Sequence, residues 1–262
     1  CIPREHVGRT WPGMAKLPVA MSTFSDSVGV AIGLVFSGDA GLWSIVWRSL
    51  LVSVLAAAIA YAVGLLAGAW LAAARFKGRG AVLTLLNTAL AVPAVVVGLV
   101  VYLLLSRSGP LGFLGWLFSV PAMVVAQTLL VLPLVTALVR QVVEDADLGH
   151  GEQLRSLGAG TLMRSLLLAW DERYALLTIF ITAFGRAISE VGTVMIVGGN
   201  IDGFTRVMTT AIALETSKGD LPLALGLGVV LLAVVLLLNA LVSLVRRWRE
   251  RADGLMPVGA AA

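Results

Sequence analysis

The stretch that decides the fold is Val229-Val-Leu-Leu-Ala-Val-Val-Leu-Leu-Leu238, an apolar run without a polar interruption. A second run of the same kind extends from Val95 to Leu105. Strands of a membrane barrel alternate polar and apolar residues, and these runs do not. Several segments approach or exceed the roughly 20 apolar residues that cross a bilayer as a helix. The sequence therefore predicts an all-α fold, a polytopic membrane helical bundle.

Composition supports a membrane protein and excludes several functional classes. The 262 residues are 59% hydrophobic and 13% charged, with a mean hydropathy of +0.96, which leaves too little charge for a soluble surface. The net charge of +4 comes from basic residues near the ends of apolar segments, so it indicates membrane topology and no nucleic-acid partner. The single cysteine, Cys1, excludes an internal disulfide and a cysteine-rich metal site, and we expect no cofactor.

Five transmembrane helices are expected, over residues 45–73, 81–105, 118–139, 174–197 and 221–245. They form one transmembrane domain over residues 43–248, which includes a polar segment at 141–173. Residues 1–42 are expected to be an extracytoplasmic or interfacial segment, and residues 249–262 a cytoplasmic tail. An N-terminus that opens at Met21 would make residues 1–20 non-native.

Small residues and prolines give further detail within these spans. Gly64-Leu-Leu-Ala-Gly68 in the first span has the spacing of a face for close helix packing. Pro93, Pro121 and Pro133 are expected to start or kink helices.

Charge gives the expected orientation. Basic residues follow the first, third and fifth spans: Arg75, Lys77, Arg79, Arg140, Arg155, Arg164, Arg173, Arg246, Arg247, Arg249 and Arg251. The loops on the other side carry Arg107, Arg206 and Lys218. Cytoplasmic loops are enriched in basic residues. The polar segment and the C-terminus are therefore predicted to face the cytoplasm, although Arg4, Arg9, Lys16 and Arg48 fall on the outer side.

The polar segment contains Glu152-Gln-Leu-Arg-Ser-Leu-Gly158 and predicts two short helices joined at 158–160. Gly158 permits the left-handed backbone that a sharp turn between helices requires. Apolar residues recur near helical spacing in the second helix: Leu162, Met163, Leu166, Leu167 and Trp170. Spacing alone leaves two interpretations open. The segment is either a docking element for a soluble partner or an amphipathic helix on the inner leaflet.

Charged residues inside the fourth span are a second candidate site. Arg186 and Glu190 are four residues apart, so they can pair on one helix face. One interpretation is a neutralised pair that orders helix packing; the other is a polar path. Ser189 and Thr193 add hydroxyl groups nearby, which can equally serve interhelical hydrogen bonds. The turn that ends at Asn200 either terminates the fourth helix or belongs to an outer gate.

The polar segment resembles a known motif. Glu152-Gln153-Leu154, three residues and Gly158 are similar to the EAA motif of ABC importer permeases, which reads Glu-Ala-Ala, three residues, Gly. Gln153 and Leu154 replace the two alanines, and the later Leu-Pro of the motif falls at Trp170-Asp171. Blocks over residues 87–88, 93–98, 104–112, 185–192 and 197–201 resemble the permease of tungstate ABC importers.

This resemblance implies a function, a site and partners. It implies the type I ABC importer permease fold in a prokaryotic cell membrane, moving tungstate, or alternatively molybdate or sulfate. Two copies would form the pathway, two copies of an ATPase subunit would dock on the EAA-like segment, and an extracytoplasmic oxyanion-binding protein would deliver the anion. The docking residues would be Glu152, Gln153, Leu154, Arg155 and Gly158, and the pathway candidates Arg186, Ser189, Glu190, Thr193 and Asn200.

Missing motifs bear on the alternatives. The chain has no G-x-x-x-x-G-K-[ST] phosphate loop, no H-E-x-x-H and no G-x-S-x-G, so a transport subunit without its own ATPase site is expected rather than an enzyme. A stand-alone secondary anion carrier, with Arg186 and Glu190 as its ion-coupling pair, is the alternative. A membrane scaffold without a transport role is a third.

Overall fold

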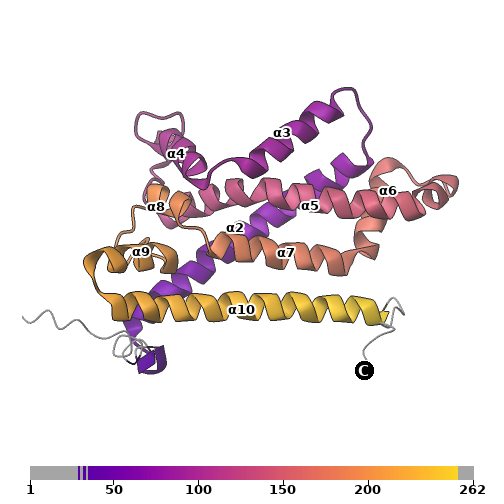
Figure 1. Cartoon of the computed structure of the whole chain (residues 1–262). Helices are drawn as coiled ribbons and strands as arrows, with labels where there is room; N and C mark the ends of the chain where they lie inside the picture. Colours follow the sequence, from indigo (N-terminus) through magenta and orange to yellow (C-terminus); the bar gives the residue numbers. More distant parts are fainter. Residues whose placement is uncertain (1–28, 30–31, 34, 253–262) are drawn as a thin grey trace, which may run out of the picture.

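The computed structural model describes residues 29, 32–33 and 35–252, and this part of the chain is helical without strands (Figure 1). The sequence predictions for residues 1–28 and 253–262 lie outside the described residues. The elements are α2 (Ala40–Ala73), α3 (Arg79–Ala91), α4 (Ala94–Leu105), the 3₁₀ turn η1 (Gly112–Leu114), α5 (Val120–Ser156), α6 (Thr161–Asp171), α7 (Arg173–Ile188), α8 (Gly192–Gly198), α9 (Met208–Lys218) and α10 (Leu221–Ala252). The predicted all-α fold is confirmed for the described residues.

Three helices of the described chain are long and apolar enough to cross a membrane by themselves: α2, α5 and residues 221–245 of α10. Two bent pairs qualify when each is taken as one span. The α3–α4 pair bends by 100° and the α7–α8 pair by 59°. The five predicted spans thus correspond to three continuous helices and two broken ones.

The two broken spans correct the expectation of continuous helices over 81–105 and 174–197. The first break lies at Val92 and Pro93, where both residues adopt extended backbone. Proline disfavours the helical conformation of the residue before it and lacks a backbone donor, and here α3 ends before Val92 and α4 begins directly after Pro93. Pro121 likewise lies in the first turn of α5, as predicted, whereas Pro133 lies inside the continuous α5.

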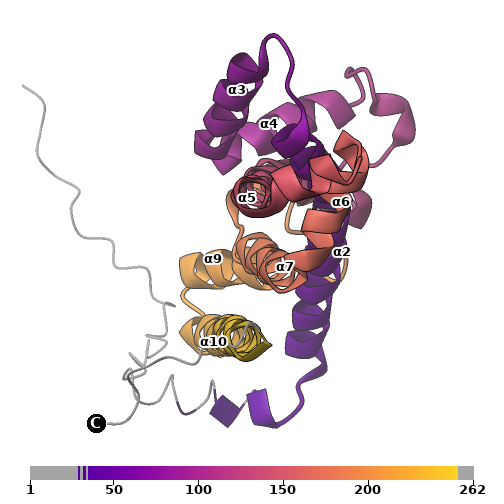
Figure 2. The ribbon, with the colours of Figure 1, turned by 90° about the vertical axis from the view of Figure 1, so that its right-hand side faces the viewer.

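Helix α5 forms the centre of the bundle. In Figure 1, α5, α7 and α10 lie in successive rows that α2 crosses diagonally, α3 lies obliquely above α5, and Figure 2 shows α2 along one edge. Gly64 and Gly68 let α2 approach α5 closely, because an added Cβ would lie 2.7 Å from Val135 Cγ1 or 2.7 Å from Thr136 O. The predicted close-packing face of the first span is therefore confirmed.

Candidate functional site

The polar segment that is predicted to dock a partner begins as an extension of the third span, α5. Helix α5 continues to Ser156, so the first of the two predicted short helices is part of the third span, which corrects the expectation of a separate helix. The predicted turn is confirmed: Gly158 has a φ of +81°, and the amide of Ala159 donates to Leu154 O at 3.0 Å. Helix α6 then runs back from Thr161.

The predicted docking residues do not all face outward. Glu152, Gln153, Arg155 and Gly158 are exposed, whereas Leu154 packs against the hydrophobic core. Leu154 is partly buried, so part of the side chain of this predicted docking residue stays accessible. The side chain of Leu162, in the apolar pattern of the second helix, lies outside the described residues.

Apolar side chains form an exposed patch around the turn. We call this patch the docking surface, after the role predicted for this segment; it comprises Leu157 (81% exposed), Met163, Leu166, Leu167 and Trp170 (73% exposed). Contiguous exposed apolar side chains rimmed by polar groups are typical of protein or membrane contact sites. The predicted apolar pattern at Met163, Leu166, Leu167 and Trp170 is thus outward-facing.

An ionic cluster underlies the docking segment. Asp147 of α5 pairs with Arg164 of α6, with Nε 2.8 Å from Oδ1, and with Arg155, with Nη2 3.4 Å from Oδ2. Glu144 of α5 pairs with Arg79 and with Arg140. Sequence analysis assigned these arginines to topology and missed their carboxylate partners. The spacing of Glu144 and Asp147, which puts both on one helix face, was the available signal.

The second candidate site lies at the break between α7 and α8, residues 189–191, which we call the polar break. Arg186 Nη1 lies 3.2 Å from Glu190 Oε2, so the predicted pair forms. However, α7 ends at Ile188, and the two residues do not share a continuous helix as expected. Glu190 Oε1 instead accepts a hydrogen bond from the Thr193 amide at 3.2 Å, near the start of α8.

The members of this pair differ in exposure. The Glu190 side chain is 5% exposed and that of Arg186 is 48% exposed. Glu190 faces a narrow pocket with no room for a water molecule, lined by polar residues from three helices and the break: Ser49, Ser53, Gln127, Glu190 and Thr209, with Val52, Ile188 and Val207. The carboxylate is therefore anchored in the packed interior, and Arg186 faces outward.

The two hydroxyl candidates, Thr193 and Ser189, also differ in exposure. Thr193 is fully buried, and its Oγ1 donates to Ala94 O at 2.8 Å, which ties α8 to α4. Ser189, directly after α7, is exposed, and its Oγ donates to Gly185 O in α7 at 2.9 Å. Of the four candidates around the break, Arg186 and Ser189 are accessible, and Glu190 and Thr193 support the packing.

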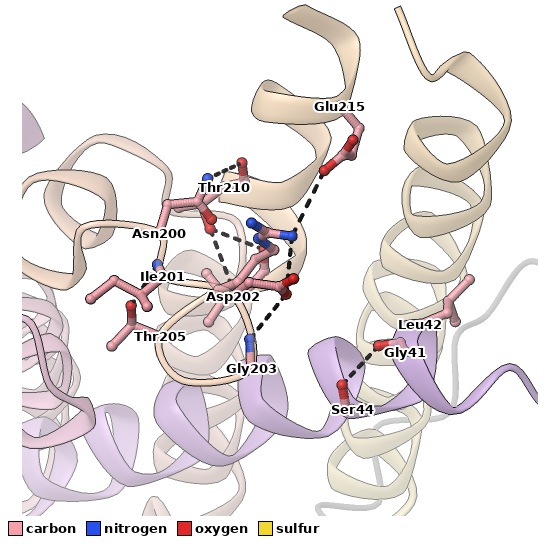
Figure 3. Close-up of polar contacts among 12 residues, drawn as sticks. Gly41, Leu42, Ser44, Asn200, Ile201, Asp202, Gly203, Thr205, Thr210 and Glu215 are labelled. Atoms are coloured by element: carbon pink, nitrogen blue, oxygen red, sulfur yellow. Dashed lines mark hydrogen bonds and ion pairs between the residues drawn. The ribbon is translucent and has the colours of Figure 1, made fainter. Parts of the chain in front are cut away.

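Asn200 belongs to a loop at the other end of the molecule from α6 (Figure 1). Its φ is +51°, and its Nδ2 donates to Thr210 O at 3.3 Å, as the close-up in Figure 3 shows. Thr205 Oγ1 donates to Gly198 O at 2.6 Å, and Arg206 pairs with Asp202 at 3.1 Å. The described contacts of Asn200 thus fix the loop that follows α8, which matches the predicted end of the fourth helix.

One family model and several known proteins match most of this chain. A model of the family described as binding-protein-dependent transport system inner membrane component matches residues 60–252. The tungstate uptake system permease protein TupB of Peptoclostridium acidaminophilum is 40% identical over 222 residues, which cover 85% of this chain and 97% of that protein. A probable anion ABC transporter permease protein of Haloferax volcanii is 41% identical over 218 residues, covering 81% and 93%. The TupB protein of Campylobacter jejuni is 34% identical over 238 residues, covering 89% and 100%.

Proposed function

Because the chain belongs to the family of binding-protein-dependent transport system inner membrane components, we propose that it is the permease subunit of an ABC importer for an oxyanion, with tungstate as the first candidate. The chain is a multi-pass inner-membrane protein. The observation that carries the proposal is the docking surface, formed by exposed apolar residues of α6 and by Leu157 at the end of the membrane helix α5. Two relatives named as tungstate uptake permeases support the substrate.

Energy comes from a separate ATPase subunit in this proposal. The chain carries no phosphate loop, so a partner must bind and hydrolyse ATP. The apolar side chains of the docking surface would fill a cleft of that partner, and exposed Glu152, Gln153 and Arg155 would form a polar rim. Closure of two ATPase subunits on ATP would push on the turn at Gly158 and tilt the attached helices, giving inward transport.

A second copy of the chain completes the pathway. None of the residues of α3 is buried in the protomer. Gly80, Thr84 and Thr88 repeat at intervals of four, a spacing of small residues that favours helix–helix contact. A Cβ added at Gly80 would meet nothing within 4 Å, unlike the glycines of α2 that α5 fills. This free face of α3 supports a homodimer in which α3 lies near the partner.

Arg186 and Ser189 would face the anion path. A charged side chain inside a bilayer costs roughly 2.5–3.5 kcal/mol on insertion scales, so a half-exposed arginine is better placed against a wet path than against lipid. Its cation attracts an oxyanion, and Glu190, held in the interior, fixes its position. An external binding protein would supply high affinity, so the path itself needs only weak attraction.

The test is tungstate uptake into proteoliposomes that contain the chain, its ATPase and an internalised ATP supply, with the binding protein outside. We expect uptake to require ATP and both partners. We also expect excess molybdate or sulfate to inhibit the uptake of labelled tungstate less than excess unlabelled tungstate does. Inhibition by molybdate or sulfate at lower concentration would reassign the substrate. Transport by the chain alone under an ion gradient would replace this proposal with the secondary carrier.

A further inference from the structure

Arg164 is a buried cation on the inner side of α6. Its side chain is 8% exposed, whereas the docking surface residues of α6, among them Met163 and Leu166, point outward. The inner side of α6 also presents Leu168 and Ala169 to the core. Arg164 therefore lies between the docking surface and the membrane helices.

Asp147 on α5 receives this cation. Its side chain is 16% exposed, and its Oδ1 lies 2.8 Å from Arg164 Nε. Its other oxygen faces Arg155, which is 44% exposed. Arg164 Nε and Asp147 Oδ1 make no hydrogen bond within the described part of the chain, so the 2.8 Å charge contact between them is the interaction that each atom makes there. We call this ion pair the latch.

Gly151 makes room for the latch. It lies inside α5, where glycine costs about 1 kcal/mol relative to alanine. A Cβ at this position would lie 2.3 Å from Asp147 Oδ1 and 2.7 Å from its Cγ. The position of the Asp147 carboxylate therefore requires the absence of a side chain one turn further along the helix.

The same end of α5 holds two more helices. Glu144 pairs with Arg79, the first residue of α3, and Arg79 also donates to Leu71 O near the end of α2 at 3.3 Å. Asp147 and Glu144 thus connect α6, α3 and the end of α2 to one helix. A displacement of α6 that is transmitted through the latch would reach all of them.

A buried ion pair adds little net stability, because the cost of desolvation offsets the attraction between the charges. What the pair can still do is hold α6 at one position on α5. We propose that the latch is a positioning device that makes α6 and α5 move as one body when the ATPase acts on the docking surface. Asp147 and Arg164 touch neither ATP nor the anion. This inference rests on the proposed function, because it assigns the mechanical link between docking and transport.

The experiment uses the reconstituted complex with tungstate and measures ATPase copurification, ATP hydrolysis and tungstate moved per ATP. In Asp147→Asn we expect the ATPase to copurify and hydrolyse ATP, while tungstate moved per ATP falls about tenfold, within the range for residues that modulate coupling. Asp147→Glu, which keeps the carboxylate, should restore at least about half of the wild-type ratio. Asp145→Asn, which removes an exposed carboxylate two residues away on α5, should stay within about twofold.

An unchanged ratio in Asp147→Asn would overturn the inference, as would an Asp147→Glu variant as defective as Asp147→Asn. Loss of ATPase copurification in Asp147→Asn would also overturn it, because the pair would then shape the docking surface. If Asp147→Asn does not reach the membrane, Arg164→Met is used, which leaves Asp147 beside Arg155, and the same criteria apply. Failure of the wild-type chain to copurify an ATPase would instead contradict the proposed function.

Discussion

At the junction of α5 and α6, the Asp147–Arg164 pair has side chains 16% and 8% exposed, whereas at the polar break the Glu190–Arg186 pair has side chains 5% and 48% exposed. Both pairs place a carboxylate in the interior. They differ in where the cation lies: Arg164 is enclosed between two helices, and Arg186 is left accessible.

This difference separates two uses of an ion pair. Enclosing both charges fixes the geometry of the helices that carry them and offers no charge to the surroundings. Anchoring only the carboxylate orients the arginine and leaves its guanidinium available to an anion. We therefore expect substitutions at the α5–α6 junction to separate ATP hydrolysis from transport, and substitutions at the polar break to change transport and stability together.

The largest effect is expected at the turn of the docking segment. Gly158 has a φ of +81°, a conformation that costs an L-residue about 1–2 kcal/mol and a β-branched one more. Gly158→Val should reorient α6. Because small misplacements of a functional element can lower rates about a hundredfold, tungstate uptake should approach background. ATP hydrolysis and the amount of protein in the membrane should persist.

The matched control is Gly160→Val. Gly160 lies two residues away with a φ of −66°, and a Cβ there meets nothing within 4 Å. This variant should transport within about twofold of wild type, as surface substitutions usually have small effects. Normal uptake by Gly158→Val would mean that the turn is not part of the docking site.

The next effect is expected at Arg186. Arg186→Gln removes the cation and leaves the buried Glu190 without its ion-pair partner. We expect uptake to fall about tenfold and unfolding free energy to fall by about 1–3 kcal/mol, the cost of an unpaired buried group. Uptake assays and thermal unfolding in detergent measure the two effects, and Arg186→Lys should recover part of both. If Arg186→Gln is destabilised but transports normally, Arg186 serves packing and not the path.

A smaller effect is expected for Glu190→Gln. The amide oxygen of glutamine can still accept from the Thr193 amide, and Arg186 is exposed enough to be solvated. The loss should be about 0.5–1.5 kcal/mol, that of one hydrogen bond, seen as a lower folding yield and a lower Tm. Equal yield and equal transport would show that the pair is not needed in the interior. A larger loss than for Arg186→Gln would reverse the assignment of anchor and exposed cation.

The sequence predicted the helical class because apolar runs such as Val95 to Leu105 admit no other membrane fold, and Gly64 and Gly68 predicted close packing. It did not predict the 100° bend at Pro93, because proline allows anything from a slight kink to a complete break. Tertiary contacts decide among these outcomes, and no local pattern encodes them.

The candidate sites were predictable to different degrees. The turn at Gly158 followed from the conformational freedom of glycine, and the pairing of Arg186 with Glu190 followed from their spacing. The separation into exposed Arg186 and buried Glu190 depends on where α7 ends, which spacing does not fix. Asp147 was missed because its partner Arg164 lies across a turn, so the pair has no fixed sequence spacing.

The smallest expected effects compare the two hydroxyl groups beside the polar break. Ser189 is exposed, and among the contacts described its hydroxyl bonds only to a carbonyl of α7. Ser189→Ala should therefore change the free energy of unfolding by less than about 0.5 kcal/mol, with a nearly unchanged Tm. Uptake should fall by a factor of about two to three if its hydroxyl contacts the anion, comparable to one weak hydrogen bond. Thr193→Val should have the opposite effects. It removes the hydroxyl that donates to the Ala94 carbonyl, so the free energy of unfolding should fall by about 1–2 kcal/mol. Uptake per amount of folded protein should stay normal. Transport normalised to folded protein decides the matter: a defect in Thr193→Val with none in Ser189→Ala would place the path on the inner side of the break, against the orientation argued from Arg186.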